Sequence, residues 1–193
     1  DENLTLSAGN NNTTGSGNIG FDGVVNSGTL GDVVVSRGST VRFEKAFSAE
    51  AFTQSFGETL TDFEGLIDVA EAFDFNGAAL TIDGNGINDI DGTMSVTNSG
   101  TFTLAQASLL TVGTFTQDGT AANVIGDNIT AEIGGITFAQ QVTLNSGIDD
   151  DTIILTTSAA DQAINFDEAD TSLAITDNEN LTLSAGNNNT TGS

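Results

Sequence analysis

The chain contains neither cysteine nor histidine among its 193 residues. Without cysteine it can form no disulfide, no thiolate zinc site and no iron–sulfur cluster. Without histidine it lacks the usual general acid or base, the usual transition-metal ligand and the side chain that titrates near neutral pH. Most metal-dependent and acid–base enzymes are therefore disfavoured before any motif is considered.

Proline, tryptophan and tyrosine are also absent. The lack of proline excludes collagen-like and polyproline fibres, and it leaves a backbone N–H at every position for a hydrogen-bonded ladder. The lack of tryptophan and tyrosine removes the common stacking platforms for carbohydrate. What remains is 37% hydrophobic residues, twelve phenylalanines and 23 glycines, a mixture that suits many short strands joined by tight turns.

Basic residues are scarce: three lysines and arginines stand against 27 acids, for a net charge of −24. Nucleic acid is an unexpected partner for such a chain, because binding it needs a basic surface. An anionic membrane surface would repel the chain, and no apolar run approaches the ~20 residues of a membrane span. Calcium and other hard cations would be attracted.

One stretch occurs twice without a change. Residues 2–16 and residues 179–193 both read ENLTLSAGNNNTTGS, 177 residues apart. A fixed period is the signature of a repeat architecture. We therefore interpret residues 1–178 as one long repeat and residues 179–193 as the start of the next copy, within a longer repetitive protein.

The predicted strands are short and regularly placed. Segments such as Leu4–Ser7 and Phe102–Leu104 alternate apolar and polar residues and end at glycine or asparagine, as half-buried strands do. Phenylalanine-centred strands recur 20 to 23 residues apart, from Phe21 to Phe43, from Phe43 to Phe63 and from Phe115 to Phe138. A parallel β-helix uses a coil of roughly 22 residues. The sequence thus predicts an all-β fold, a parallel β-helix or β-solenoid, with about 8 rungs per repeat and a rise of roughly 38 Å.

Residues 43–75 are the ambiguous part of the chain. Their phenylalanines are spaced roughly as on one face of an amphipathic helix. Against a helix stand Gly57, Gly65 and the echo of residues 51–54 (AFTQ) in residues 114–117 (TFTQ). We favour strands here, and a helical circular-dichroism signal would contradict that choice.

Two longer segments, residues 41–84 and 113–147, carry the short motifs F-T-Q, I-x-F and N-S-G, and the N-L-T-L motif lies in the exact repeat. In this texture the chain resembles the repetitive regions of giant bacterial exported proteins, namely filamentous-haemagglutinin-like and autotransporter-passenger-like adhesins. The resemblance implies a right-handed parallel β-helix and an extracellular or cell-surface location. It carries no catalytic signature.

Residues 83–92 (DGNGINDIDG) are the strongest candidate for a metal site. Carboxylates and amides alternate with glycines there, and calcium prefers such oxygen ligands on a turning backbone. Asp83, Asn85, Asp89 and Asp91 are the predicted ligands, and a polar corner between rungs is the alternative. The second acidic cluster, residues 149–151 (DDD), is either a solvated loop or a cation site.

All three basic residues lie within nine positions, at Arg37, Arg42 and Lys45. They either pair with Glu44 and Glu50 on the surface or form a contact patch for the acidic flank of a neighbouring subunit. Self-association is the expected partnership, both end to end and laterally, because a stacked coil exposes a strand edge at each end.

These features favour a structural protein over an enzyme, because the paired carboxylates or groove bases of β-helix hydrolases and lyases are not evident. We predict a structural repeat unit of an extracellular bacterial fibre or surface filament. The alternative is the stalk of a large surface adhesin whose ligand-binding tip lies outside this sequence.

Overall fold

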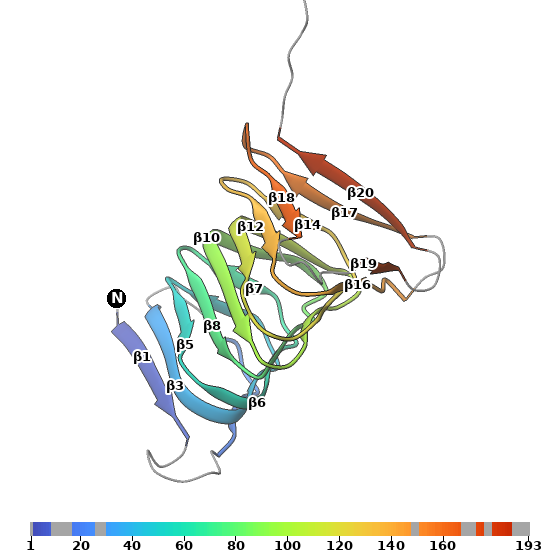
Figure 1. Cartoon of the computed structure of the whole chain (residues 1–193). Coiled ribbons are helices and arrows are strands. Elements are labelled where there is room, and N and C mark those ends of the chain that lie inside the picture. The colour runs from blue at the N-terminus through green and yellow to red at the C-terminus, as the bar shows by residue number, and fades with distance from the viewer. Residues whose placement is uncertain are drawn as a thin grey trace, which may run out of the picture.

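The computed structural model describes residues 2–8, 17–25, 30–147, 151–166, 173–175 and 179–186. Over these residues the chain is all-β and contains no helix, and its strands stack as successive coils of a parallel β-solenoid (Figure 1). None of the described residues forms a helix long and apolar enough to cross a membrane. The predicted fold class, an all-β parallel β-solenoid, is confirmed.

In the described part of the chain, twenty strands make up the coils: β1 Glu2–Ser7, β2 Ile19–Phe21, β3 Leu30–Phe43, β4 Phe47–Ala49, β5 Phe52–Gln54, β6 Gly57–Phe63, β7 Ile67–Val69, β8 Phe73–Gly77, β9 Ala79–Ile82, β10 Gly86–Asn98, β11 Phe102–Leu104, β12 Ser108–Gln117, β13 Asn123–Ile125, β14 Ile129–Ala131, β15 Ile136–Phe138, β16 Val142–Leu144, β17 Thr152–Thr157, β18 Ile164–Phe166, β19 Leu173–Ile175 and β20 Asn180–Ala185.

Strands of the inner coils pair in parallel with strands one coil before and one coil after them, strands of the end coils pair on one side, and the pairings run in three columns. The first column contains β1, the first half of β3, β5, β8, the second halves of β10 and β12, β15 and β18. The second column contains β2, the end of β3, β6, β9, β11, β13, β16 and β19. The third column contains Val25, β4, β7, the first halves of β10 and β12, β14, β17 and β20.

The register agrees with the predicted coil length in the middle of the chain. Between residues 19 and 144, paired residues lie 19 to 22 positions apart, as in Phe52↔Phe73 and Val41↔Thr61. Towards both ends the separation grows to 26–31 positions, because longer connections are inserted between the strands. The right-handed sense and the number of rungs in a full repeat stay predictions.

The ambiguous residues 43–75 form strands, so the helical alternative is wrong. Within each strand the burial alternates with period two: Phe47 and Ala49 point inward on β4, and Phe52 and Gln54 do so on β5. The connections between such strands separate consecutive inward residues by three positions, as from Ala49 to Phe52, or by four, as from Phe43 to Phe47. The spacing of two positions within a strand and the longer spacing across a connection together resemble the spacing of apolar residues on a helix face, although no helical hydrogen bond is formed.

Phenylalanines from successive coils form the centre of the core. The Phe63 ring is fully buried and lies 4.6 Å from Phe43 in a stacked arrangement, and 5.4 Å from Phe52 in an edge-on one. Offset and edge-on contacts of this kind add to the free energy gained by burial alone. The inward row therefore does two jobs, excluding water and fixing the register between coils.

We predict that Phe63→Ala lowers the free energy of unfolding by about 3–5 kcal/mol, because it opens a cavity among four other phenylalanines. Phe56→Ala is the matched control, since the Phe56 side chain is 44% exposed and lies outside the core. Urea unfolding followed by circular dichroism measures both. Equal losses for the two variants would contradict the assignment of the core.

Candidate functional site

The predicted calcium loop is an extended corner in the structure. Asp83 and Asn85 lie in the connection between β9 and β10, and Asp89 and Asp91 point outward from β10; all four are exposed. Outward neighbours on a strand stand about 6.6 Å apart along the chain, so they do not wrap around one point. Among the described residues, no three Asp or Glu side chains gather in a group able to hold a metal. The structure brings only Asp89 and Asp91 together on one face, and calcium binding stays a prediction.

The polar residue that organises this corner is Asn88, which the sequence analysis did not single out. Its side chain is fully buried, and its Oδ1 accepts a hydrogen bond from the backbone N–H of Ile67 at 3.1 Å. Its Nδ2 donates to the carbonyl oxygens of Gly84 at 3.1 Å and Leu109 at 3.3 Å. One amide thus joins three successive coils, which supports the alternative that this segment is a polar corner. The signal for it was an asparagine at an inward position of an alternating strand.

The outer face of the third column gathers negative charge. Asp89 lies opposite Asp68 in the register of β10 and β7. Partial burial raises the pKa of Asp89 above its ordinary value of 3.8, and the nearby charges of Asp91, Glu132 and Asp68 raise it further. Like charges facing each other across paired strands destabilise the folded state. This face therefore carries electrostatic repulsion at neutral pH.

The second predicted cation cluster lies mostly beyond what the structure describes, since Asp149 and Asp150 fall outside the described residues. Asp151 is exposed and lies immediately before β17. Its Oδ1 accepts a hydrogen bond from the N–H of Thr152 at 2.7 Å, and its carbonyl oxygen accepts one from the N–H of Asn180 at 2.7 Å.

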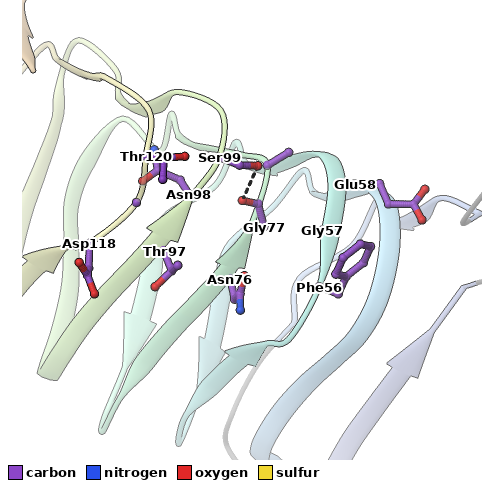
Figure 2. Close-up of a pocket in the computed structure, with 12 residues that line it drawn as sticks. Phe56, Gly57, Glu58, Asn76, Gly77, Thr97, Asn98, Ser99, Asp118 and Thr120 are labelled. Carbon is purple, nitrogen blue, oxygen red and sulfur yellow. Dashed lines mark hydrogen bonds between the residues drawn. The ribbon is translucent and has the colours of Figure 1, made fainter. Parts of the chain in front are cut away.

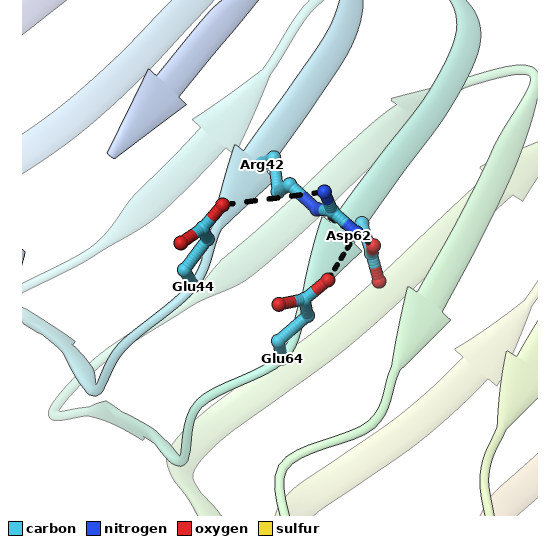
Figure 3. A network of polar contacts seen from close by, with 4 residues as sticks. All are labelled: Arg42, Glu44, Asp62 and Glu64. Carbon is cyan, nitrogen blue, oxygen red and sulfur yellow. Dashed lines mark ion pairs between the residues drawn. The ribbon is translucent and has the colours of Figure 1, made fainter. Parts of the chain in front are cut away.

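The basic residues lie in different surroundings, and Arg42 is surrounded by acids (Figure 3). The Arg42 guanidinium pairs with Glu44 at 4.0 Å, with Asp62 at 3.5 Å and with Glu64. Asp62 and Glu64 follow Arg42 and Glu44 by 20 positions, so the coil length places them alongside. The predicted pair with Glu44 is present, whereas Glu50 forms no ion pair in the part of the chain described.

Asp62 shows how crowded this cluster is. Burial raises its pKa above the ordinary value of 3.8 and the Glu64 charge raises it further, although Arg42 acts in the opposite direction. Arg37 lies with its guanidinium carbon 4.8 Å from the centre of the Phe56 ring, a cation–π arrangement. Lys45 is exposed and makes no ion pair with any described residue. A role of Arg37, Arg42 and Lys45 in contacts between subunits stays a prediction.

A groove of about 380 Å³ runs along the corners that follow the first column (Figure 2). Four successive coils contribute to it, through residues 56–58, 76–78, 97–99 and 118–120. Glycines recur in this lining at Gly57, Gly77 and Gly119. Because they carry no side chain, the backbones of neighbouring coils approach closely, and the remaining polar side chains form the rim.

Behind the groove lies a row of buried amides. Gln117 Nε2 donates to Asn98 Oδ1 at 2.8 Å, and Gln117 Oε1 accepts from Asn123 Nδ2 at 3.2 Å. Three coils earlier in the same column, Gln54 Oε1 accepts from the Thr61 hydroxyl at 2.8 Å. The bond between Gln117 and Asn98 joins neighbouring coils, whereas the bonds of Asn123 to Gln117 and of Thr61 to Gln54 each lie within one coil.

Comparison with known proteins does not assign this chain to a family. No protein-family model matches the chain, and neither the curated proteins nor the solved structures include a significant match.

We predict that Arg42→Gln lowers the free energy of unfolding by on the order of 1 kcal/mol, because three carboxylates lose their shared cation. The loss should shrink in high salt, which screens the remaining repulsion. Lys45→Gln is the control and should leave stability unchanged. Chemical unfolding at low and high ionic strength measures both, and a loss that does not depend on salt would contradict an ionic origin.

We predict that Asp89→Asn raises the midpoint of thermal unfolding by about 1–3 °C at neutral pH, because it removes like-charge repulsion. A raised carboxyl pKa makes the folded state bind its proton more tightly, so wild-type stability falls as pH rises from 3.8 through the folded pKa. The advantage of the variant is therefore full at neutral pH and disappears as pH falls toward 3.8.

The matched control for this prediction is Asp74→Asn. Asp74 is also an exposed strand aspartate, but its register neighbours are the uncharged Thr53 and Ser95. It should show little change in thermal midpoint and little dependence on pH. An equal rise in the thermal midpoint of both variants would show that the repulsion comes from the net charge of the chain and not from the acids that neighbour Asp89.

Proposed function

We propose that this chain is a structural repeat unit of an extracellular bacterial fibre, in which units stack end to end. The observation that supports this most directly is the state of the first and last described coils. Both carry apolar side chains that pack on the core and are only partly covered: Leu4, Leu6, Ile19 and Phe21 on one, and Ile164, Phe166 and Leu181 on the other.

These side chains point inward along the same columns as the fully buried core. Every coil between them has a neighbouring coil on each side, which covers its apolar side chains and pairs its strand edges. The end coils carry similar apolar side chains and strand edges but have only one neighbouring coil. Another coil of the same kind would supply apolar contacts and would also satisfy the unpaired backbone groups of the strand edge. Stacking with another unit of this chain meets both needs at once.

The acidic outer surface supports a fibre that stays dispersed at low ionic strength. With a net charge of −24, neighbouring fibres repel one another at distances up to about a Debye length, roughly 10 Å at 0.1 M salt. Divalent cations would weaken that repulsion even without an ordered site. Lateral bundling that depends on calcium or magnesium is part of this proposal, and so is the extracellular location that the resemblance to exported adhesins implies.

The test of end-to-end stacking uses the purified 193-residue chain. Sedimentation velocity should show assembly that grows with protein concentration, and negative-stain electron microscopy should show unbranched filaments. Adding a chelator should separate bundles into single filaments and leave the filaments intact. A chain that stays monomeric at every concentration would contradict the proposed function.

The stalk of an adhesin is distinguished from a fibre by electron microscopy of producing cells labelled with an antibody against this chain. Continuous label along free fibres supports the fibre. Label confined to short projections at the cell envelope, with unlabelled tips, would replace the fibre by a stalk.

A further inference from the structure

The exact repeat forms a strand at both of its positions, and the two strands have different neighbours. β1 and β20 lie at opposite ends of the stack in Figure 1. β1 pairs with β3 of the coil that follows it, whereas β20 pairs with β17 of the coil that precedes it. The sequence that the two strands share, NLTLS, therefore forms one ladder through one edge and a second ladder through the other edge.

The two registers are compatible in a single strand. Leu4 pairs with Val33 and Leu6 with Val35. Their counterparts 177 positions later, Leu181 and Leu183, pair with Ile153 and Leu155. Ile153, Leu155, Val33 and Val35 are all buried and inward-facing. A strand with both sets of neighbours would place leucines between buried aliphatic side chains at two successive inward positions.

We propose that one copy of this strand joins successive units, pairing with β17 of one copy of the chain and with β3 of the next. When two separate chains join, β20 of the first takes the place of β1 on β3 of the second. This inference rests on the proposed end-to-end stacking and names its contact. The partner is a second copy of this chain, because only such a copy offers a β3 whose existing neighbour has the same sequence as β20.

The joint also shifts the columns. β1 belongs to the first column and β20 to the third, so the first column of one unit continues the third column of the unit before it. In chain order, β2 of the second copy then follows β18 of the first. Ile19 and Phe21 would lie over Ile164 and Phe166, which are among the half-covered apolar residues of the two end coils.

This placement continues the aromatic row. Phe21 stacks on Phe43 at 5.1 Å within its own unit, and Phe166 stacks on Phe138 at 5.7 Å. Contact between Phe21 and Phe166 would join the two pairs into one row. The joint also covers Leu183, which is 50% exposed on β20 although its equivalent inward positions in earlier coils, Leu155 and Ile129, are buried.

Replacement of β1 by β20 exchanges like for like. The leucines and backbone groups that leave β3 are identical to those that arrive, so the exchange itself is close to neutral. β1 is also held with two irregularities of register, next to Leu4 and next to Ser7. The net gain comes from burying the apolar residues of both end coils, which drives the association.

The test uses engineered cysteines in a chain that has none of its own. Thr182 corresponds to Thr5, which pairs with Val34. Within one chain Thr182 pairs with Ile154 at the far end of the stack, so a disulfide in the Val34→Cys/Thr182→Cys variant has to join two chains. Partners in a ladder lie within the Cα separation of about 4.4–6.8 Å that a disulfide needs. We expect covalent oligomers on non-reducing gels and monomers after reduction.

Two matched variants complete the test. Thr5→Cys/Val34→Cys should form a disulfide within one chain and remain monomeric on the gel. Thr5→Cys/Asn165→Cys reports the competing joint, in which the first columns are aligned and β1 lies over β18. Oligomers from this pair in place of the Val34/Thr182 pair would overturn the proposed joint and leave end-to-end stacking intact. No assembly of any variant, or of the unmodified chain, would reject both.

The repeated sequence provides a second measurement, free of cross-links. Leu6→Asp weakens β1 on β3 and should favour its replacement, whereas Leu183→Asp weakens the incoming strand. We expect Leu6→Asp to assemble at lower protein concentration than the unmodified chain and Leu183→Asp to need roughly tenfold more protein or beyond. Circular dichroism checks that both variants are folded. Equal impairment by the two substitutions would overturn the strand replacement.

Discussion

The parallel backbone ladder between coils is the interaction on which the rest of this structure depends. Each strand donates and accepts hydrogen bonds along both edges, so it needs one neighbour before it and one after it. The three columns satisfy this requirement coil by coil, without a turn that reverses the chain direction between paired strands. The ladder also determines which side chains stack on one another. In a parallel register, an inward-facing residue lies above an inward-facing residue, and an outward-facing residue lies above an outward-facing one.

Side chains then decide which register the ladder adopts. Inward, phenylalanines stack with centroid separations of 4.6 to 5.7 Å, and a slip of one residue would turn the whole row outward. Two of the inward polar side chains, Asn88 and Gln117, carry amides that form hydrogen bonds with neighbouring coils. Outward, the same stacking is unfavourable, since it brings Asp68 opposite Asp89 and leaves acids to share a single cation at Arg42. The ladder and the core outweigh this repulsion.

Much of this architecture could be predicted from residue spacing. The recurrence of Phe21, Phe43 and Phe63 gave the coil length, and alternation within segments gave strands even where the phenylalanines imitate a helix. The local arrangement of the acidic and basic side chains was harder to predict from the sequence. The pattern of Asp83, Asn85, Asp89 and Asp91 reads as a loop when only sequence order is considered, yet Asp89 and Asp91 lie on a straight strand. Which acids surround Arg42 depends on a separation of 20 positions in that coil, a detail that the average of roughly 22 does not supply.

The exact repeat combines a constraint from the ladder with one from the core. A strand at the joint has to accept two different neighbours, β17 on one edge and β3 on the other, and its backbone can do so in any column. Its side chains are more restrictive. Leucine at alternate positions suits both neighbours, because it packs against the aliphatic side chains of either strand and needs no hydrogen-bond partner. The polar residues between these leucines point outward in both settings, where no column imposes a shape. A leucine–threonine–leucine strand can therefore continue either column, as the proposed joint between units requires.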